Sequence, residues 1–98
     1  MSLPVILRRL AQAEFDAAAD WYEGRRAGRG AAFTAAVRQV LAAIASQPEA
    51  YPVVHGDVRE APISGYPDAV YYRPEPSQIT VLAVFHTSRD PAEWQRRA

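Results

Sequence analysis

The chain has no cysteine, no lysine and two histidines among its 98 residues. Without cysteine it forms no disulfide, no thiolate metal site and no cysteine nucleophile. Two histidines, His55 and His86, are too few for a histidine-rich metal centre. We therefore expect neither a metal nor a cofactor.

Long hydrophobic runs are also missing. No apolar stretch approaches the roughly 20 residues that a membrane-spanning helix needs. The first residues, MSLPVILRRL, place their arginines after the apolar patch and contain no cleavage site, so they are not typical of a signal peptide. Hydrophobic residues make up 49% of the chain and charged residues 22%, which is ordinary for a globular domain. We expect a cytoplasmic protein that has no contact with a membrane.

The length of the chain limits its organisation. Domains most often contain about 100–150 residues, so we expect residues 1–98 to form a single domain. A two-domain enzyme is excluded, and so is a barrel surrounded by helices, which needs a much longer chain.

Charge is balanced along the sequence. The chain has eleven arginines and eleven acidic residues, so its net charge is zero. Residues 1–50 carry six arginines and five acidic residues, and residues 51–98 carry five and six. Strong non-specific binding to nucleic acid depends on clustered basic residues, and neither half of the chain has such a cluster. The use of arginine as the sole basic residue is typical of a protein from a GC-rich genome. The alternative explanation is a preference for arginine because its guanidinium group binds anions in a bidentate manner.

Hydrophobic spacing predicts a strand followed by two helices. Residues 3–8 are typical of a short strand. From Leu10, apolar residues recur at helical spacing, and Trp21 and Tyr22 are expected in the core. The glycine-rich segment EGRRAGRG ends this first helix. A second apolar helical stripe follows from Phe33, and Pro48 ends it. The two helices should form an αα-hairpin.

After Pro52 the pattern indicates strands. Residues 57–63, 68–73 and 78–86 are separated by turn sequences and form a predicted antiparallel meander. The last of these strands is apolar on both faces, which is typical of a central strand. The tail, DPAEWQRRA, can form one helical turn.

The predicted order is therefore β-α-α-β-β-β, a two-layer α+β fold. Each helix has one apolar face, which must be buried against the sheet. The opposite face of the sheet is then expected to be polar or to be covered by a partner.

A set of short motifs runs in order along nearly the whole chain. No single motif is specific, but the ordered set is fairly specific. In chain order the motifs are Leu10-Ala11, Trp21-Tyr22, Gly30 with Phe33, Pro48 with Tyr51-Pro52, Val58-Arg59, Tyr66-Pro67, Tyr72-Arg73, the stretch VLAVFH at residues 81–86, and Arg89-Asp90-Pro91. This set resembles the RelE/ParE superfamily of toxins from type II toxin–antitoxin systems, whose members are also called plasmid stabilisation proteins.

The resemblance implies one of two activities. RelE-like toxins are ribosome-dependent endonucleases that cut mRNA, whereas ParE-like toxins bind and poison DNA gyrase without being enzymes. In both branches an antitoxin binds the toxin through a segment that folds on binding, which gives a toxin–antitoxin hetero-oligomer. The lack of lysine and of net positive charge weakens docking onto the polyanionic ribosome. We therefore expect a ParE-like toxin that acts by binding, with the mRNA endonuclease as the alternative.

The endonuclease alternative makes specific demands on side chains. RNA cleavage needs a general base, a general acid and cations that stabilise the phosphorane. Here the candidate catalytic residues are His86, Arg59 and Arg73. The other possibility is that His86 caps the end of its strand. If Tyr72 pairs opposite Thr80 and Arg59 opposite Tyr72, then Arg59, Tyr72 and His86 share one face of the sheet, and a slip of one residue breaks this grouping.

The resemblance also implies where the antitoxin binds. We expect its tail in the groove between the helical hairpin and the sheet, with Arg59, Arg73 and Arg89 near the rim. Trp94 lies beside arginines in the tail, and this combination suits a protein interface. The alternative for Trp94 is packing against the sheet.

Overall fold

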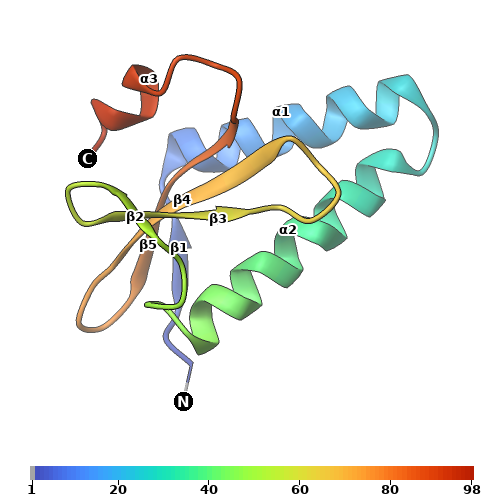
Figure 1. Ribbon diagram of the computed structural model, residues 1–98. Helices are drawn as coiled ribbons and strands as arrows, with labels where there is room; N and C mark the ends of the chain where they lie inside the picture. Colours follow the sequence, from blue (N-terminus) through green and yellow to red (C-terminus); the bar gives the residue numbers. More distant parts are fainter. Residues whose placement is uncertain (1) are drawn as a thin grey trace.

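The computed structural model describes residues 2–98, which form one mixed five-stranded sheet with a pair of long helices (Figure 1). The elements are β1 (Val5–Leu7), α1 (Arg9–Arg25), α2 (Arg29–Ser46), β2 (Val53–His55), β3 (Val58–Pro62), β4 (Asp68–Pro74), β5 (Ile79–His86) and α3 (Ala92–Gln95). The predicted α+β order is confirmed. The structure adds the short strand β2, and the predicted helical turn in the tail is α3.

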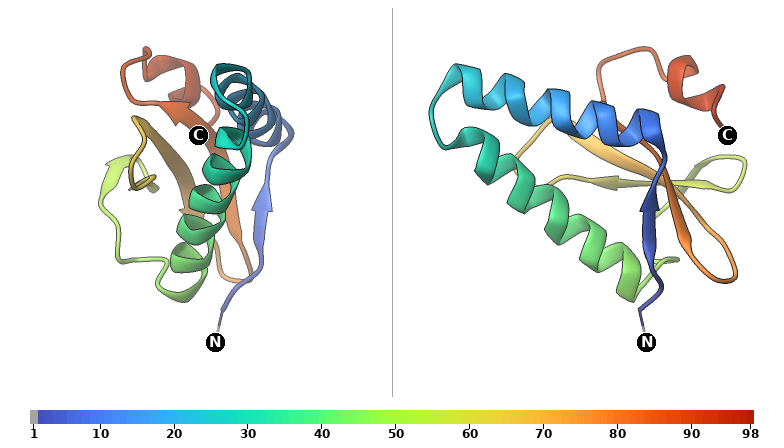
Figure 2. Two further views of the ribbon diagram at one scale, coloured as in Figure 1. Left: turned by 90° about the vertical axis from the view of Figure 1, so that its right-hand side faces the viewer. Right: turned by 180° about the vertical axis from the view of Figure 1, so that it is seen from behind.

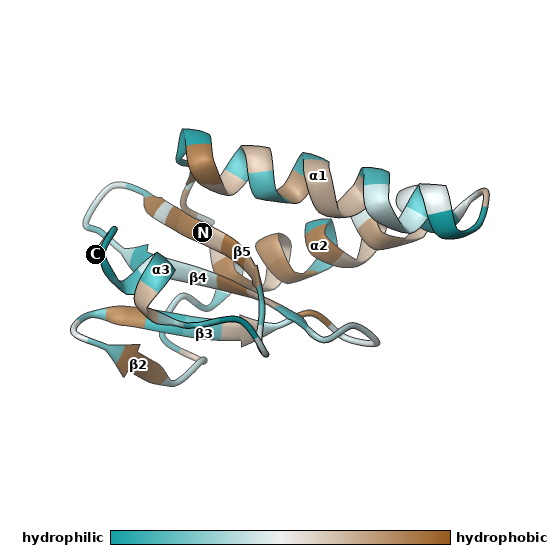
Figure 3. Ribbon diagram, turned by 90° about the horizontal axis from the view of Figure 1, so that it is seen from above, coloured by the Kyte–Doolittle hydropathy of each residue, from teal (hydrophilic) through white to brown (hydrophobic). Residues whose placement is uncertain are grey.

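The strand order in the sheet is β1-β5-β4-β3-β2. The strands from β2 to β5 are antiparallel to their neighbours, while β1 pairs parallel to β5. As predicted, the strand that is apolar on both faces lies inside the sheet. Strand β2 was not predicted, because all three of its residues are exposed and it lacks the alternation that marks a half-buried strand. Figure 3 shows β2 as a hydrophobic segment at the edge of the sheet.

Helices α1 and α2 cover one face of the sheet. Seen from behind in Figure 2, both lie in front of the strands. Phe15 and Phe33 meet edge to face between the two helices, with ring centroids 6.2 Å apart. Below them the helices pack on Val70, Tyr72 and Val81 of the sheet. Burial of this apolar face holds the hairpin on the sheet.

The turn between the helices is shorter than the glycine-rich segment suggests. α1 continues through Gly24, and α2 begins at Arg29. The Glu23 carboxylate accepts hydrogen bonds from the backbone N–H groups of Gly28 and Gly30, each at 3.0 Å. The N-cap residue of α2, Gly28, has no side chain that could accept a hydrogen bond, so Glu23 supplies the acceptors at this end of the helix.

The opposite face of the sheet is partly covered by the chain itself. Trp94 of α3 is 3% exposed, and its ring stacks on Tyr71 with centroids 4.3 Å apart. His55 of β2 meets the same indole edge to face. These side chains join a second buried cluster that includes Leu82 and Phe85. The expectation of a polar or partner-covered face is thus wrong here, because the C-terminal turn folds back over it.

An ion pair joins the C-terminal turn to α1 and β5. Strand β1 pairs with β5 only as far as Val81. Beyond that point, Arg97 donates to the Leu82 carbonyl at 3.1 Å, and Glu14 accepts the Val84 N–H at 3.1 Å. Arg97 and Glu14 also bind each other through both guanidinium nitrogens, at 2.9 and 3.0 Å. The Glu14 carboxylate raises the pKa of Arg97. The pair satisfies backbone groups that a neighbouring strand would otherwise bind.

The close approach of the two helices predicts the effect of enlarging Gly30. An alanine Cβ at this position would lie 2.8 Å from the Ala19 carbonyl oxygen. Gly30→Ala should therefore lower the free energy of unfolding by about 1–3 kcal/mol in urea denaturation. Gly24→Ala is the matched control: its Cβ meets nothing within 4 Å, so helix propensity should make this variant more stable by about 0.5–1 kcal/mol. Equal effects of the two changes would contradict the packing described here.

The ion pair at the edge of β5 predicts a second stability effect. Glu14→Gln removes the charge that Arg97 binds, and it should lower the free energy of unfolding by about 1–3 kcal/mol. In a Trp21→Phe background, where Trp94 is the remaining tryptophan, its emission should shift to longer wavelength as α3 loosens. The control is Glu93→Gln, which breaks the exposed pair with Arg89 and should cost less than about 1 kcal/mol. An unchanged Trp94 emission in Glu14→Gln would show that the pair does not hold α3.

Candidate functional site: a groove beside helix α1

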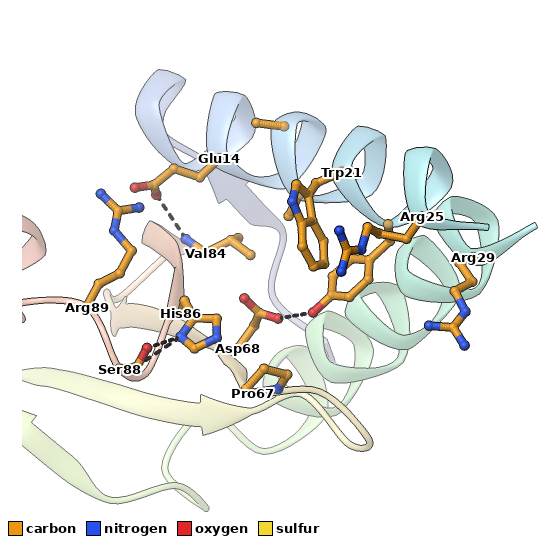
Figure 4. A pocket seen from close by; sticks show the side chains of 13 residues that line it. Glu14, Trp21, Arg25, Arg29, Pro67, Asp68, Val84, His86, Ser88 and Arg89 are labelled. Atoms are coloured by element: carbon orange, nitrogen blue, oxygen red, sulfur yellow. Dashed lines mark hydrogen bonds between the residues drawn. The ribbon is translucent and has the colours of Figure 1, made fainter. Parts of the chain in front are cut away.

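A groove of about 810 Å³ lies between α1 and the ends of β4 and β5 (Figure 4). Its apolar surface comes from Ala17, Ala18 and Trp21 on one side of α1 and from Val84 of β5. The α1 residues recur at the spacing of one helix face. The Trp21 side chain is 57% exposed, so the prediction that Trp21 lies in the core is wrong. Its ring instead forms part of the wall of the groove.

Asp68 lies at the base of this groove, at the first position of β4, and is 7% exposed. Its Oδ2 accepts a hydrogen bond from the Tyr22 hydroxyl at 2.9 Å. Burial and the neighbouring Asp68 carboxylate raise the pKa of Tyr22 to about 12. The Tyr22 hydroxyl is therefore protonated at neutral pH and donates to the carboxylate.

Three arginines surround the groove: Arg25, Arg29 and Arg89. The Arg25 guanidinium lies over the Trp21 ring, 4.9 Å from its centroid. Arg89 binds the Glu93 carboxylate at 2.6 Å and lies 4.4 Å from the centroid of Phe85. The groove thus combines an apolar wall, a cationic rim and a carboxylate at its base.

His86 ends β5 and faces the same groove. Its Nδ1 accepts the Ser88 backbone N–H at 3.1 Å, and the Ser88 hydroxyl lies 2.6 Å from the same nitrogen. Because a backbone N–H can only donate, Nδ1 carries no proton in this arrangement, and the neutral ring is protonated at Nε2. The ring therefore binds the turn that follows its own strand, as the capping alternative describes.

The predicted sheet register is wrong by one residue at β5. Arg59 pairs opposite Tyr72 as assumed, but Tyr72 pairs opposite Val81 rather than Thr80. A bulge next to Tyr72 compensates for the slip, because one extra residue on β5 returns the later side chains to the same face. Arg59, Tyr72 and His86 therefore do share the helix-covered face.

Sharing a face does not bring these residues together. His86 pairs opposite Asp68, four residues along β4 from Tyr72, which is about 13 Å at the usual rise of a strand. The Arg59 guanidinium donates to the carbonyls of Tyr51 and Glu49, at 2.6 and 3.2 Å. Arg59 thus holds the loop that follows α2 and does not line the groove.

Arg73 lies on the other face of the sheet from Tyr72, since neighbouring residues of a strand point to opposite sides. It donates to the exposed Asp57 carboxylate at 2.8 Å and holds the pKa of Asp57 below its usual range. Trp94 is buried on that face as well. Of the four residues predicted to contact an antitoxin, the groove includes only Arg89. Arg25, Arg29 and Asp68 were not identified as site residues from the sequence. No signal in the sequence marked them, because the exposure of Trp21 and the burial of Asp68 depend on how the elements pack.

Neither a membrane-spanning helix nor a metal site is present in the part of the chain that the structure describes. Between residues 2 and 98, no helix is long and apolar enough to cross a membrane. The same part of the chain holds no group of three or more histidine, aspartate or glutamate residues arranged to bind a metal ion.

Comparisons with known proteins agree with the fold. A search of curated proteins found no match. Among solved structures, the chain is similar to one described as the chromosomal ParDE TA system from P. aeruginosa, with a TM-score of 0.65 and 18% sequence identity, over 87% of this chain and 96% of the other. The family profile described as "ParE toxin of type II toxin-antitoxin system, parDE" matches residues 5–91. The chain therefore belongs to the ParE toxin family of type II toxin–antitoxin systems.

Proposed function

We propose that this ParE-family protein acts by binding DNA gyrase, and that an antitoxin neutralises it by occupying the groove beside α1. The observation that carries the proposal is the groove itself, a large open surface with an apolar wall, an exposed tryptophan and a cationic rim. Such a surface is typical of protein–protein recognition, in which tryptophan and arginine contribute most of the binding energy.

The positions of the candidate catalytic residues favour binding over RNA cleavage. General acid–base catalysis needs its groups within hydrogen-bonding reach of one substrate. Arg59 and His86 are offset by about 13 Å along the strand direction and lie on strands separated by β4, and Arg73 lies on the opposite face, bound to Asp57. The endonuclease alternative would need these three residues at one phosphate.

The charge of the groove supports an antitoxin as its occupant. The resemblance implies an antitoxin tail with apolar anchors and acidic residues. Trp21, Ala18 and Val84 offer the apolar contacts, and Arg25 and Arg29 offer cationic ones. A segment that folds on binding can cover such a long surface.

Induction without the antitoxin tests the target. We expect DNA breaks and filamentation in cells, and DNA cleavage by gyrase when the purified protein is added to it in vitro. Rapid cleavage of mRNA at ribosomal A-site codons, with gyrase activity unchanged, would contradict the proposal.

His86→Asn separates binding from catalysis in the same assay. Asparagine can still accept the Ser88 N–H, but it cannot transfer a proton at neutral pH. Toxicity should therefore stay within about twofold of the wild type, provided that circular dichroism shows the fold intact. A folded His86→Asn protein without toxicity would support the endonuclease alternative.

Trp21→Ala tests whether the groove binds the antitoxin. The measurement is the Kd of the protein encoded beside this gene, by titration calorimetry. Loss of a central aromatic anchor should raise the Kd by roughly 30-fold or more. Val53→Ala is the matched control: Val53 is similarly exposed but lies on β2, outside the groove, and its loss should leave the Kd nearly unchanged. Equal Kd values for the wild type and Trp21→Ala would place the antitoxin elsewhere.

A further inference from the structure

Asp68 is a buried carboxylate without a counter-charge of its own. Its side chain is 7% exposed, and among residues 2–98 no cationic group forms an ion pair with it. A buried charge is normally paired or bound to a metal, because removing it from water is costly. The described residues provide no metal site here.

Arg25, Arg29 and Arg89 line the groove, and none of them forms an ion pair with Asp68. Arg97 binds Glu14, and Arg89 binds Glu93. Arg25 lies over the Trp21 ring, and His86 directs Nδ1 to Ser88. The Tyr22 hydroxyl donates to Oδ2 of Asp68 but brings no charge.

The second carboxylate oxygen of Asp68 is accessible from the groove. The described side chains include no polar atom that is both buried and without a hydrogen-bond partner, and the one side-chain hydrogen bond of Asp68 is the bond at Oδ2. Oδ1 therefore remains open to the groove. Figure 4 shows the Asp68 side chain between His86 and Trp21, and the Tyr22 hydroxyl donates to its carboxylate.

We propose that Asp68 binds a cationic side chain, arginine or lysine, of the peptide segment that occupies this groove. The inference rests on the proposed function, since it takes that segment to be the antitoxin. An ammonium or guanidinium group would donate to Oδ1 and supply the missing charge, and a hydrogen bond between two charged groups is stronger than one between neutral groups. Tyr22 holds the carboxylate in place from its other side.

The rim and the base of the groove then favour opposite charges on one partner. Arg25 and Arg29 near the helical turn favour acidic side chains, while Asp68 at the base favours a basic one. An apolar residue between them would contact Trp21. A partner with the reversed order would place like charges together, which disfavours its binding. Asp68 is therefore a specificity determinant as well as an anchor.

The test is the affinity of Asp68→Asn for the antitoxin encoded beside this gene, measured by titration calorimetry. Asparagine retains an acceptor for Tyr22 but loses the charge, so the Kd should rise at least about 30-fold. Asp57→Asn is the matched control, because it makes the same change at an exposed pair outside the groove, and its Kd should change less than about threefold. Each arginine and lysine of the antitoxin can be replaced in turn by glutamine. At one position this change should weaken binding to the wild type but have little effect on binding to Asp68→Asn.

The outcomes separate this inference from the proposed function. If the wild type does not bind the antitoxin, the proposed function fails. If the wild type and a folded Asp68→Asn bind it equally, the proposed function stands and the role of Asp68 is wrong. If Asp68→Asn instead abolishes self-association of the toxin, the occupant is a second copy, and the inference is overturned.

A second measurement needs no variant. N-acetyl-arginine amide, added to the 15N-labelled wild type, should shift the NMR signals of the Trp21 indole and of Asp68 in a saturable way. N-acetyl-citrulline amide has nearly the same shape without the charge and should not. Equal shifts from both compounds, or none from either at 50 mM, would overturn the proposal even if Asp68→Asn fails to fold.

Discussion

The pairing of Glu14 with Arg97 connects the two ends of this chain across the edge of its central strand. Past Val81, β5 has no neighbouring strand on that side, and the two side chains bind the backbone groups that remain. Arg8 donates in turn to the Arg97 carbonyl at 2.8 Å. These contacts act together with the burial of Trp94 against Tyr71 to hold α3 on the sheet. The ion pair thus helps to close the sheet face opposite α1 and α2.

The open side of α1 carries the groove. Small residues on α1 leave room beside the sheet, and Trp21 extends over this space rather than into the core. The groove also brings together opposite charges: arginines at its rim and the buried Asp68 at its base. A surface that presents both charges at fixed positions selects a partner by the order of its charges as well as by its apolar residues.

Predictions from the sequence were correct where the hydrophobic pattern arises within a single helix or strand. The stripe from Phe33 marked α2, and the continuous apolar run marked β5 as an inner strand. Expectations about which side chains lie together were wrong where several elements meet. Arg59 and Arg73 were expected at one rim, but the alternation of a strand puts them on opposite faces. For Trp94 the alternative, packing against the sheet, is the one observed, because the returning tail buries it on Tyr71.

The sequence by itself determined the order of the elements, except for the short strand β2, and the membership of the ParE family, because helical and strand periodicities are local and family motifs run along the chain. The tertiary structure alone decided that Asp68 is buried beneath Trp21 and that a bulge at Tyr72 keeps His86 on the helix-covered face. These outcomes depend on contacts between residues far apart in the chain, such as Tyr22 with Asp68. The spacing of residues along the chain does not show which distant segment will bury a carboxylate. Tertiary packing therefore determines whether Asp68 is buried.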